Sequence, residues 1–346
     1  MNVTTYGVDL AKLVFQVHWL EPQTGEVQRK KLSRAQFAEF FARRAAGIVA
    51  VEACGSAHHW GRRLREWGHE VRLIPTQFVR PFVKSNKTDS ADAQAIWEAA
   101  QRPEMRFVAV KSEQQQAVLG LHRLRTQLVK VRTMHANQIR GLLYEFGVVL
   151  PQGWQTLLKQ AGPMLADQKF SDVPELIREG LREQLQGMRE LTARIDQLER
   201  SIRSYHQQDE QCRRIQAIPG VGPLISTAVL ASVADARTFR SGREFAAYLG
   251  LVPRQSGTGG RVKLLGISKR GDGYIRNLLV LGARSVLYHA NRTGRTPQPW
   301  LQALRSRRPT NVVVVALANK MARIIWALLA HGRSYDSGWR RTLPGT

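Results

Sequence analysis

The sequence is poor in acidic residues, in cysteine and in long apolar runs. Asp and Glu number 27 against 52 Lys and Arg, so the formal net charge is +25 and the sequence pI is about 11.1. The two cysteines, Cys54 and Cys212, fit neither a disulfide framework nor a zinc-binding spacing, which favours a reducing compartment. The most apolar stretch, residues 312–318, is closed by Asn319 and is too short to span a bilayer.

The composition is otherwise that of a folded chain, with 43% hydrophobic and 23% charged residues. Residues 1–100 and 101–200 each have a net charge of +4, whereas residues 201–346 carry 23 Lys and Arg against 6 Asp and Glu, a net charge of +17. We therefore expect the C-terminal part to grip a polyanion, with nucleic acid favoured over a membrane surface. No secretion signal pattern opens the chain, so we expect a cytoplasmic, nucleoid-associated protein with no membrane contact.

The first region, residues 1–110, alternates strand and helix patterns. We predict strands at 4–10, 14–19, 27–32, 48–51 and 70–74, and helices at 34–44, 57–67 and 90–100. Ser33 is expected to cap the first helix, because its side-chain oxygen can accept from a first-turn N–H. The predicted order, βββαβαβα, indicates an α/β layer fold with a mixed sheet.

The second region, residues 111–208, is predicted to be helical. Apolar residues recur at helical spacing in two stretches. The first stripe comprises Val118, Leu121, Leu124, Leu128, Val131, Ile139 and Leu142. The second comprises Leu181, Leu185, Met188, Leu191, Ile195, Leu198, Ile202 and Tyr205. The second stripe is typical of a coiled coil and favours a homo-oligomer, a dimer or tetramer, although it could instead pack against the first helix.

One face of the first of these helices is predicted to be basic. From Gln114 to Tyr144 there is no acidic residue. Candidate nucleic-acid contacts there are Arg123, Arg125, Lys130 and Arg132, with Arg140 on the same segment. Residues 152–170 contain glycine and proline and are predicted to form a connector.

The third region, residues 209–346, is predicted to be mainly α-helical with glycine-rich loops. Its segment Ile218-Pro-Gly-Val-Gly-Pro223 resembles a helix-hairpin-helix turn, in which Gly220 and Gly222 would let the backbone approach a phosphate. Candidate phosphate contacts around the later glycine-rich segment are Arg254, Arg261, Lys263, Lys269, Arg270 and Arg276. Taken singly, each of these residues is more often an ordinary solvated charge.

Four acidic residues of the first region stand at chemically informative places. Asp9 lies in the first strand, Glu52 follows the apolar strand 48–51, and Asp89 and Asp92 open a helix three residues apart on one face. Carboxylates from two strands and a helix suit one or two Mg2+ ions, which could clamp a phosphodiester during strand cleavage. Each acid alone could be a helix-end or turn residue; the combination favours a metal site. His58 and His59 follow Glu52 in the sequence and could support the acids, but their interpretation as ordinary helix-start residues is favoured.

These residues occur in motifs that resemble the DEDD-type transposases of insertion sequences. The motifs are Gly7-Val-Asp-Leu-Ala-Lys12, Asn86-Lys-Thr-Asp-Ser-Ala-Asp-Ala93, Phe245-Ala-Ala-Tyr-Leu-Gly-Leu-Val-Pro-Arg254 and Gly266-Ile-Ser-Lys-Arg-Gly271. The resemblance implies an RNase H-like, Holliday-junction-resolvase-like N-terminal domain, a helical middle and a C-terminal transposase domain. Its four catalytic acids would be Asp9, Glu52, Asp89 and Asp92.

The resemblance also implies a hydroxyl nucleophile in the C-terminal domain that links covalently to DNA. Matching the Ser-Gly dipeptide places it at Ser256, and ungapped spacing places it at Thr258. Serine chemistry favours Ser256, and Thr258 stays open. A glycine loop that only holds phosphate is the alternative for this segment. Because acids and hydroxyl lie in different domains, the active centre would be assembled by docking of domains or protomers.

The function expected from this combination is Mg2+-dependent cleavage and exchange of DNA strands at the ends of an insertion sequence. The family resemblance further implies a non-coding guide RNA that pairs with donor and target DNA. Two alternatives are a junction nuclease that hydrolyses DNA with water and a nucleic-acid-binding protein without catalysis.

Overall fold

The computed structural model describes residues 3–83, 89–167, 172–258, 261–293, 299–336 and 338. Within these ranges the side chains of Asp89, Ser90, Thr258 and Thr293 are not described. The chain divides into two compact units: unit 1 comprises Met1–Gln116 with Val233–Asp235, and unit 2 comprises Ala117–Ser232 with Ala236–Thr346. The middle and C-terminal regions therefore group together in unit 2.

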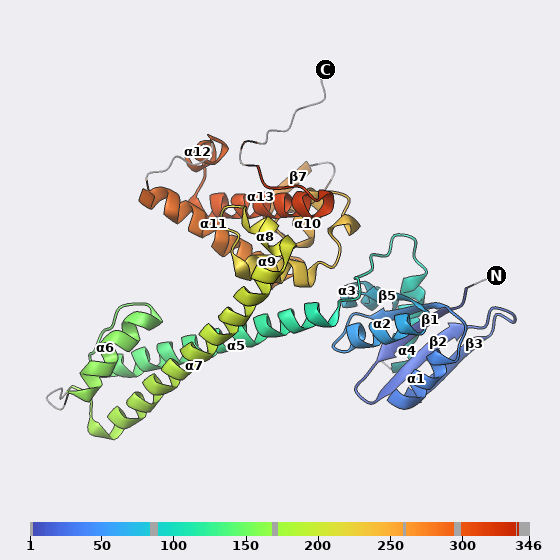
Figure 1. Ribbon diagram of the computed structural model, residues 1–346, viewed down its shortest axis with the longest axis horizontal. Helices are drawn as coiled ribbons and strands as arrows, with labels where there is room; N and C mark the ends of the chain where they lie inside the picture. Colours follow the sequence, from blue (N-terminus) through green and yellow to red (C-terminus); the bar gives the residue numbers. More distant parts are fainter. Residues whose placement is uncertain are drawn as a thin grey trace, which may run out of the picture. The chain divides into compact units, whose positions relative to one another are not determined.

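Unit 1 is a five-stranded mixed sheet with helices on both faces (Figure 1). Its elements are β1 (Thr5–Leu10), β2 (Val14–Leu20), β3 (Val27–Ser33), α1 (Arg34–Ala42), β4 (Ile48–Glu52), α2 (Ala57–Glu66), β5 (Glu70–Ile74), α3 (Thr76–Val79), η1 (Arg80–Phe82) and α4 (Asp89–Ala100). The strand order is β3-β2-β1-β4-β5, with the β1–β4 and β4–β5 pairs parallel and the other two antiparallel. This confirms the predicted βββαβαβα order and mixed sheet; only the short α3 and η1 were not predicted.

Strand alternation divides the core of unit 1 between the two faces of the sheet. On one face Phe15 packs edge-on against Phe37 of α1 and Trp60 of α2. On the other face Ala50 lies in a cluster with Ile96 and neighbouring residues of α4. Ser33 makes the predicted cap: its hydroxyl accepts from the Gln36 N–H while the Gln36 side chain accepts from the Ser33 N–H, closing a capping box.

In the part of unit 2 that the structure describes, the regular elements are helices and one β-hairpin. Its elements are α5 (Glu113–Glu145, of which the first four residues belong to unit 1), α6 (Trp154–Ala166), α7 (Glu175–Gln208), α8 (Glu210–Gln216), α9 (Pro223–Ser232), η2 (Ala236–Thr238), α10 (Gly242–Tyr248), β6 (Pro253–Thr258), β7 (Arg261–Ile267), α11 (Gly273–Thr293), α12 (Pro299–Arg305) and α13 (Thr310–His331). The prediction of a mainly helical C-terminal region is confirmed, but β6 and β7 replace the expected glycine loop.

Helices α5 and α7 form an antiparallel hairpin whose far end is closed by α6 (Figure 1). Arg125 pairs with Glu199 (2.7 Å), and Arg132 donates to the Thr192 hydroxyl (3.3 Å), which fixes the antiparallel register. The expectation of a connector at 152–170 is wrong: Leu157, Ala161 and Leu165 recur at helical spacing and are fully buried, and this burial outweighs the cost of Pro163 inside α6.

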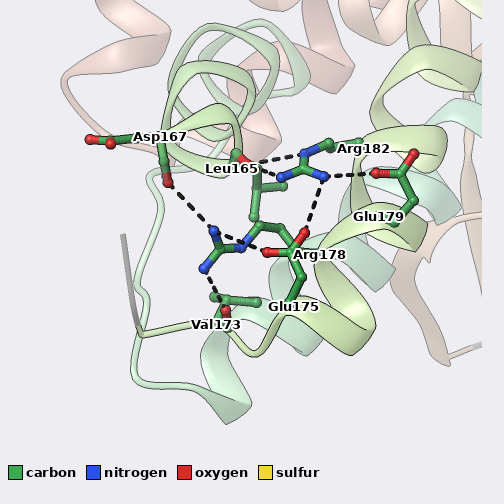
Figure 2. Close-up of polar contacts among 7 residues, drawn as sticks. All are labelled: Leu165, Asp167, Val173, Glu175, Arg178, Glu179 and Arg182. Carbon is green, nitrogen blue, oxygen red and sulfur yellow. Dashed lines mark hydrogen bonds and ion pairs between the residues drawn. The ribbon is translucent and has the colours of Figure 1, made fainter. Parts of the chain in front are cut away.

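Two arginines of α7 hold the end of α6 (Figure 2). Arg182 donates to the Leu165 carbonyl from Nε (3.1 Å) and Nη2 (2.9 Å), and also pairs with Glu179 (2.7 Å). Arg178, only 6% exposed, donates to the Val173 carbonyl (2.9 Å). These guanidinium groups satisfy carbonyls that a helix end and the following loop leave without partners.

The apolar stripe predicted for α5 is only partly buried. Its buried residues include Val118 and Ile139, but Leu124 is 53% exposed, because α7 covers the neighbouring stripe that contains Arg132 and Ala136. On α7, Leu181, Leu185, Met188, Ile195 and Ile202 are buried, whereas Leu191, Leu198 and Tyr205 are half-buried. The hairpin therefore keeps a second, incompletely covered apolar flank.

Helix α13 is longer than the apolar run 312–318 suggested. It continues through Asn319, whose amide donates to the Leu251 carbonyl (3.1 Å), and through Lys320, whose ammonium lies 4.4 Å from the centre of the Trp300 ring. By length and composition alone this helix is long and apolar enough to cross a membrane, because it extends well beyond the run 312–318 on which the expectation was based. A core helix passes the same test, and α13 packs against α10 and α11 within unit 2.

Candidate functional site

Asp9 and Glu52 lie at the same edge and on the same face of the sheet in unit 1. Val8 pairs with Val51 on the parallel strands β1 and β4, so the residues that follow them, Asp9 and Glu52, occupy neighbouring positions. Gly7 in β1 and Ala50 in β4 face α4, and Asp9 and Glu52 each follow them by two residues, so both acids lie on the α4 face of the sheet. The carboxyl ends of parallel strands thus bring the two predicted acids together.

Gly7 sets how closely α4 approaches β1. A Cβ atom at position 7 would collide with the Ala93 carbonyl oxygen and lie 2.6 Å from the Trp97 backbone N and Cβ. The Trp97 indole N–H donates to the Thr5 carbonyl (3.0 Å), which fixes the helix along the strand. Helix α4 therefore rests directly on the backbone of β1, with no side chain between them.

The N-terminus of α4 points towards the same edge as Asp9. Trp97 lies near Thr5 and Ala93 near Gly7, so α4 runs antiparallel to β1. Asp89 precedes Ala93 by about 6 Å of helix, and Asp9 follows Gly7 by about 6.6 Å of strand. The backbone of Asp89 is therefore level with Asp9, and Asp92 follows within the first turn of α4.

The pKa of the Cys54 thiol, close after the end of β4, reflects both burial and the negative charge at this edge. Burial is the largest cause that raises the pKa of its thiol, and the carboxylates of Glu52 and Asp9 raise it further, while the Ser56 N–H acts in the opposite direction. The Cys54 sulfur also lies 3.8 Å from the Leu10 carbonyl oxygen. Two carboxylates thus act on one thiol at the carboxyl end of β1 and β4, which makes the edge electronegative.

This edge offers the chemistry of a hard cation site without a closed metal cage. Among the side chains that the structure describes, no three His, Cys, Asp or Glu residues cluster closely enough to hold a metal ion, and Asp89 is not among those described. The available donors are carboxylate oxygens from β1, β4 and α4. Such donors fit Mg2+, which keeps several waters and takes further oxygens from a substrate phosphate.

The two candidate hydroxyl residues lie on the β6–β7 hairpin of unit 2. Ser256 pairs with Lys263 and Thr258 pairs with Arg261, so these four positions share one face of the hairpin. Ser256 is exposed; of Thr258 only the backbone position is described. The alternation of Val262 and Leu264 with polar or small residues is the strand signal that the glycine-based interpretation overlooked.

A hollow of about 260 Å3 lies beside Ser256, lined by Gln255, Ser256, Gly257, Arg261 and Val262. A larger hollow of about 610 Å3 adjoins it along the same hairpin. The second is lined by Ala247, Val252, Pro253, Arg254, Gln255, Leu264, Ser268 and Arg270. The predicted basic residues Arg254, Arg261 and Arg270 thus border concave surface next to the hydroxyl.

The loop after β7 is held tightly to the end of α10. Lys269 adopts φ 54°, a left-handed conformation unusual for a residue with a side chain, and its N–H donates to the Gly250 carbonyl (3.1 Å). Arg276 donates from Nη1 to the carbonyls of Leu249 (2.9 Å) and Arg270 (3.2 Å). Arg276 therefore supports the loop internally, while Lys269 and Arg270 are exposed.

The two glycines of the 218–223 turn have different surroundings. Gly220 has φ +84°, and a Cβ there would lie 2.7 Å from the Gly282 carbonyl oxygen and from Val286 of α11. Gly222 has open space where a Cβ would stand. At Gly220 the lack of a side chain is required for packing on α11, whereas Gly222 has no such requirement, and a phosphate contact at either glycine stays a prediction.

The four basic residues predicted on α5 fall into two pairs. Arg125 forms an ion pair with Glu199. Arg132 is buried, and its guanidinium lies 4.0 Å from the centre of the Trp154 ring. The expectation of exposed phosphate contacts at these two positions is corrected, because α7 and α6 cover them. Arg123 and Lys130 are exposed, as a phosphate contact requires.

His58 has a partner in unit 1 that the sequence did not indicate. It lies in the first turn of α2, and its Nδ1 accepts from the Lys111 backbone N–H (3.2 Å). The Lys111 ammonium also lies 3.2 Å from Nε2 of the same ring. His58 therefore joins the start of α2 to the segment after α4, in line with its interpretation as a helix-start residue.

Comparison with known proteins identifies the family. A family profile described as "Transposase IS116/IS110/IS902 family" matches residues 212–298, and the DEDD transposase profile of IS110 elements matches residues 6–147. A "Probable family 20 transposase" of Pseudomonas aeruginosa is 50% identical over 98% of this chain and 100% of its own length. The "Transposase for insertion sequence element IS1328" of Yersinia enterocolitica is 40% identical over 97% and 99%, and that for IS1111A of Coxiella burnetii 41% over 97% and 92%. The chain therefore belongs to the IS110/IS116 family of insertion-sequence transposases.

Proposed function

We propose that the protein cuts DNA strands at the ends of an insertion sequence and joins them to new partners. The observation that carries the proposal is the meeting of Asp9, Glu52 and the N-terminus of α4 at one edge and one face of the sheet. An edge with this many carboxylates repels a phosphodiester unless a cation stands between them. That requirement points to phosphoryl chemistry rather than to a purely architectural role.

In this proposal Asp9, Glu52, Asp89 and Asp92 hold Mg2+. When bound, the ion supplies Lewis-acid stabilisation of charge at the scissile phosphate. The chain's own contribution is to fix the carboxylates, through the parallel pairing of β1 with β4 and the close seat of α4 on Gly7. Strands and a helix rather than loops thus carry the backbone positions of all four acids.

The hydroxyl of Ser256 is the proposed nucleophile, with Thr258 as the alternative on the same hairpin face. Its oxygen bonds to phosphorus while the bond from phosphorus to the 3′ oxygen breaks; the hydroxyl proton leaves to a base or water, and the 3′ oxygen gains a proton. The adduct keeps a phosphodiester bond, now between serine and DNA. The 3′ hydroxyl of another strand can therefore attack this phosphate, release the serine and form the new DNA joint. Lys263 and Arg261, which pair with these positions, offer positive charge to the phosphate.

Contacts to the nucleic-acid backbone are proposed for the exposed basic residues of unit 2. These are Arg123, Lys130, Arg254, Arg261, Lys263, Lys269 and Arg270, with the backbone at Gly222. All seven lie outside the acid-bearing unit, and all except Arg123 and Lys130 lie in residues 201–346, where the net charge is +17. Neutralising phosphates with such residues supplies sequence-independent affinity.

Two further partners belong to the proposal: a non-coding guide RNA and a second copy of the chain. The uncovered apolar flank of the hairpin, with Leu124 and the half-buried Leu191 and Leu198, favours self-association. Light scattering of the purified protein, before and after ribonuclease treatment, measures both. We expect a mass of at least two chains after treatment and a larger mass before it; one chain of 39.0 kDa in both samples would contradict both partners.

The alternative enzyme is a junction nuclease that uses water as nucleophile, and the alternative binder has no catalysis. The deciding experiment incubates the protein with DNA carrying the element's ends, with Mg2+ or with EDTA, and analyses it in denaturant. We expect cleavage only with Mg2+, accompanied by a protein–DNA adduct that survives denaturation. Cleavage without an adduct would favour hydrolysis, and unchanged DNA in both samples would contradict an enzyme.

A further inference from the structure

The face of the sheet that carries the acids continues onto the edge strand β3. Lys31 pairs with Gln16 of β2, and Gln16 pairs with Asp9 of β1, so the three side chains stand in one row on one face. Neighbouring strands are about 4.8 Å apart, which places Lys31 about 9.6 Å from Asp9 at the backbone. A cation thus lies two strands from the acid edge and level with it.

Lys31 belongs to the face of β3 that is not used for the core. Leu32, the next residue, is buried against α1, and Arg29, two residues earlier, reaches the rim of α4, where Nη2 donates to Gln94 (3.1 Å). Lys31 is exposed, and within the described residues no carboxylate pairs with it. An exposed lysine usually serves solubility, but this one is fixed by sheet register in line with Asp9.

We infer that Lys31 binds a phosphate of the DNA strand that is being cut, next to the phosphate at the acid edge. The inference rests on the proposed function and adds the direction of the strand: across the sheet, from β1 and β4 towards β3. A chain of phosphates approaching several carboxylates gains from a cation on the same face, one or two strands away. Gln16, half-buried between the two, is uncharged and leaves this path without a further acid.

The chain offers a matched control in the adjacent residue. Lys30 has the same charge and lies in the same strand, but it faces the opposite side of the sheet, with its ammonium 5.3 Å from the centre of the Phe40 ring of α1. Replacing either lysine by alanine changes the net charge equally. Only the face from which the charge is removed differs between the two variants.

The experiment measures the affinity of Lys31→Ala and Lys30→Ala for DNA carrying the element's ends, over a series of salt concentrations. For Lys31→Ala we expect weaker binding and a slope of log affinity against log salt that is smaller by about 0.9. Lys30→Ala should keep the wild-type slope, and Lys31→Arg should restore it. Thermal unfolding of each variant controls for the fold.

Equal slopes for Lys31→Ala and Lys30→Ala would overturn the inference, as would a loss confined to RNA. Because binding is measured without cleavage, this result is independent of whether the acids catalyse the reaction. If wild-type protein binds DNA but never cuts it, the proposed function fails while the slopes still decide the place of Lys31. If cutting is observed and the slopes are equal, only the inference fails.

Discussion

Replacement of Glu52 by glutamine, or of Asp9 by asparagine, should reduce the joining of element ends about 100- to 1,000-fold or more. Each change removes one negative charge and keeps nearly the same shape, so the sheet should still form. The two residues follow the pair Val8–Val51 on parallel strands, and either loss leaves a cation with fewer oxygen ligands. The measurement is the rate of strand joining in Mg2+, with thermal unfolding to confirm the fold.

Glu70→Gln is the matched control for this prediction. Glu70 lies in the same sheet at the opposite end of β5, where it pairs with Arg72, and Ile74 at the other end is the neighbour of Glu52. This exposed ion pair contributes about 1 kcal/mol or less, so joining should continue at the wild-type rate. Equal rates for Glu52→Gln and wild type would remove the basis for the metal site.

Loss of the covalent adduct is the expected result of replacing Ser256 by alanine. A primary hydroxyl on the exposed face of β6, opposite Lys263, is the simplest source of a phosphoserine link. Thr258→Ala should retain the adduct, because it removes a more hindered secondary hydroxyl at a neighbouring pair. The measurement is the denaturant-resistant protein–DNA species in the presence of Mg2+, and peptide mapping then locates the linked residue.

Ser268→Ala provides the hydroxyl control for this experiment. Ser268 lines the larger hollow beside the hairpin but lies in the loop after β7, where its hydroxyl faces the Arg270 N–H at 3.5 Å. Its removal should leave the adduct intact. An adduct that persists in Ser256→Ala and disappears in Thr258→Ala would assign the nucleophile to Thr258, and persistence in all three variants would exclude both hydroxyls.

The fold of unit 1 was predictable because its signals are local. Apolar alternation, the Ser33 capping box and glycine or proline at the turns all act within a few residues, and the five strands follow them. The errors in unit 2 have a different origin. Pro163 suggested a connector where burial of Leu157 and Leu165 stabilises a helix, and the three glycines among residues 257–260 suggested a loop where β6 and β7 form a hairpin.

The meeting of two predicted acids at one edge of the sheet was predictable, and the surroundings of the other predicted site residues were less so. Acids at strand ends and at a helix start indicate a common edge, and the register of β1 and β4 bears out the neighbourhood of Asp9 and Glu52. The burial and pairing of Arg125 and Arg132 were not predictable, because they depend on which side of α5 packs against α7. Contacts between helices far apart in the sequence leave no local signal.

The direct contact of α4 with the backbone of Gly7 also determines how copies of the gene respond to a mutation at this position. Every substitution at position 7 adds at least one carbon, and that carbon has no space between the strand and the Ala93 carbonyl. Even the smallest substitution at this position therefore displaces α4, and the backbone of Asp89 and Asp92 moves with the helix. At Gly55 an added carbon meets nothing within 4 Å, so a substitution there leaves the surrounding residues in place. On the proposed function, we therefore expect any single substitution at position 7 to abolish strand joining by that copy.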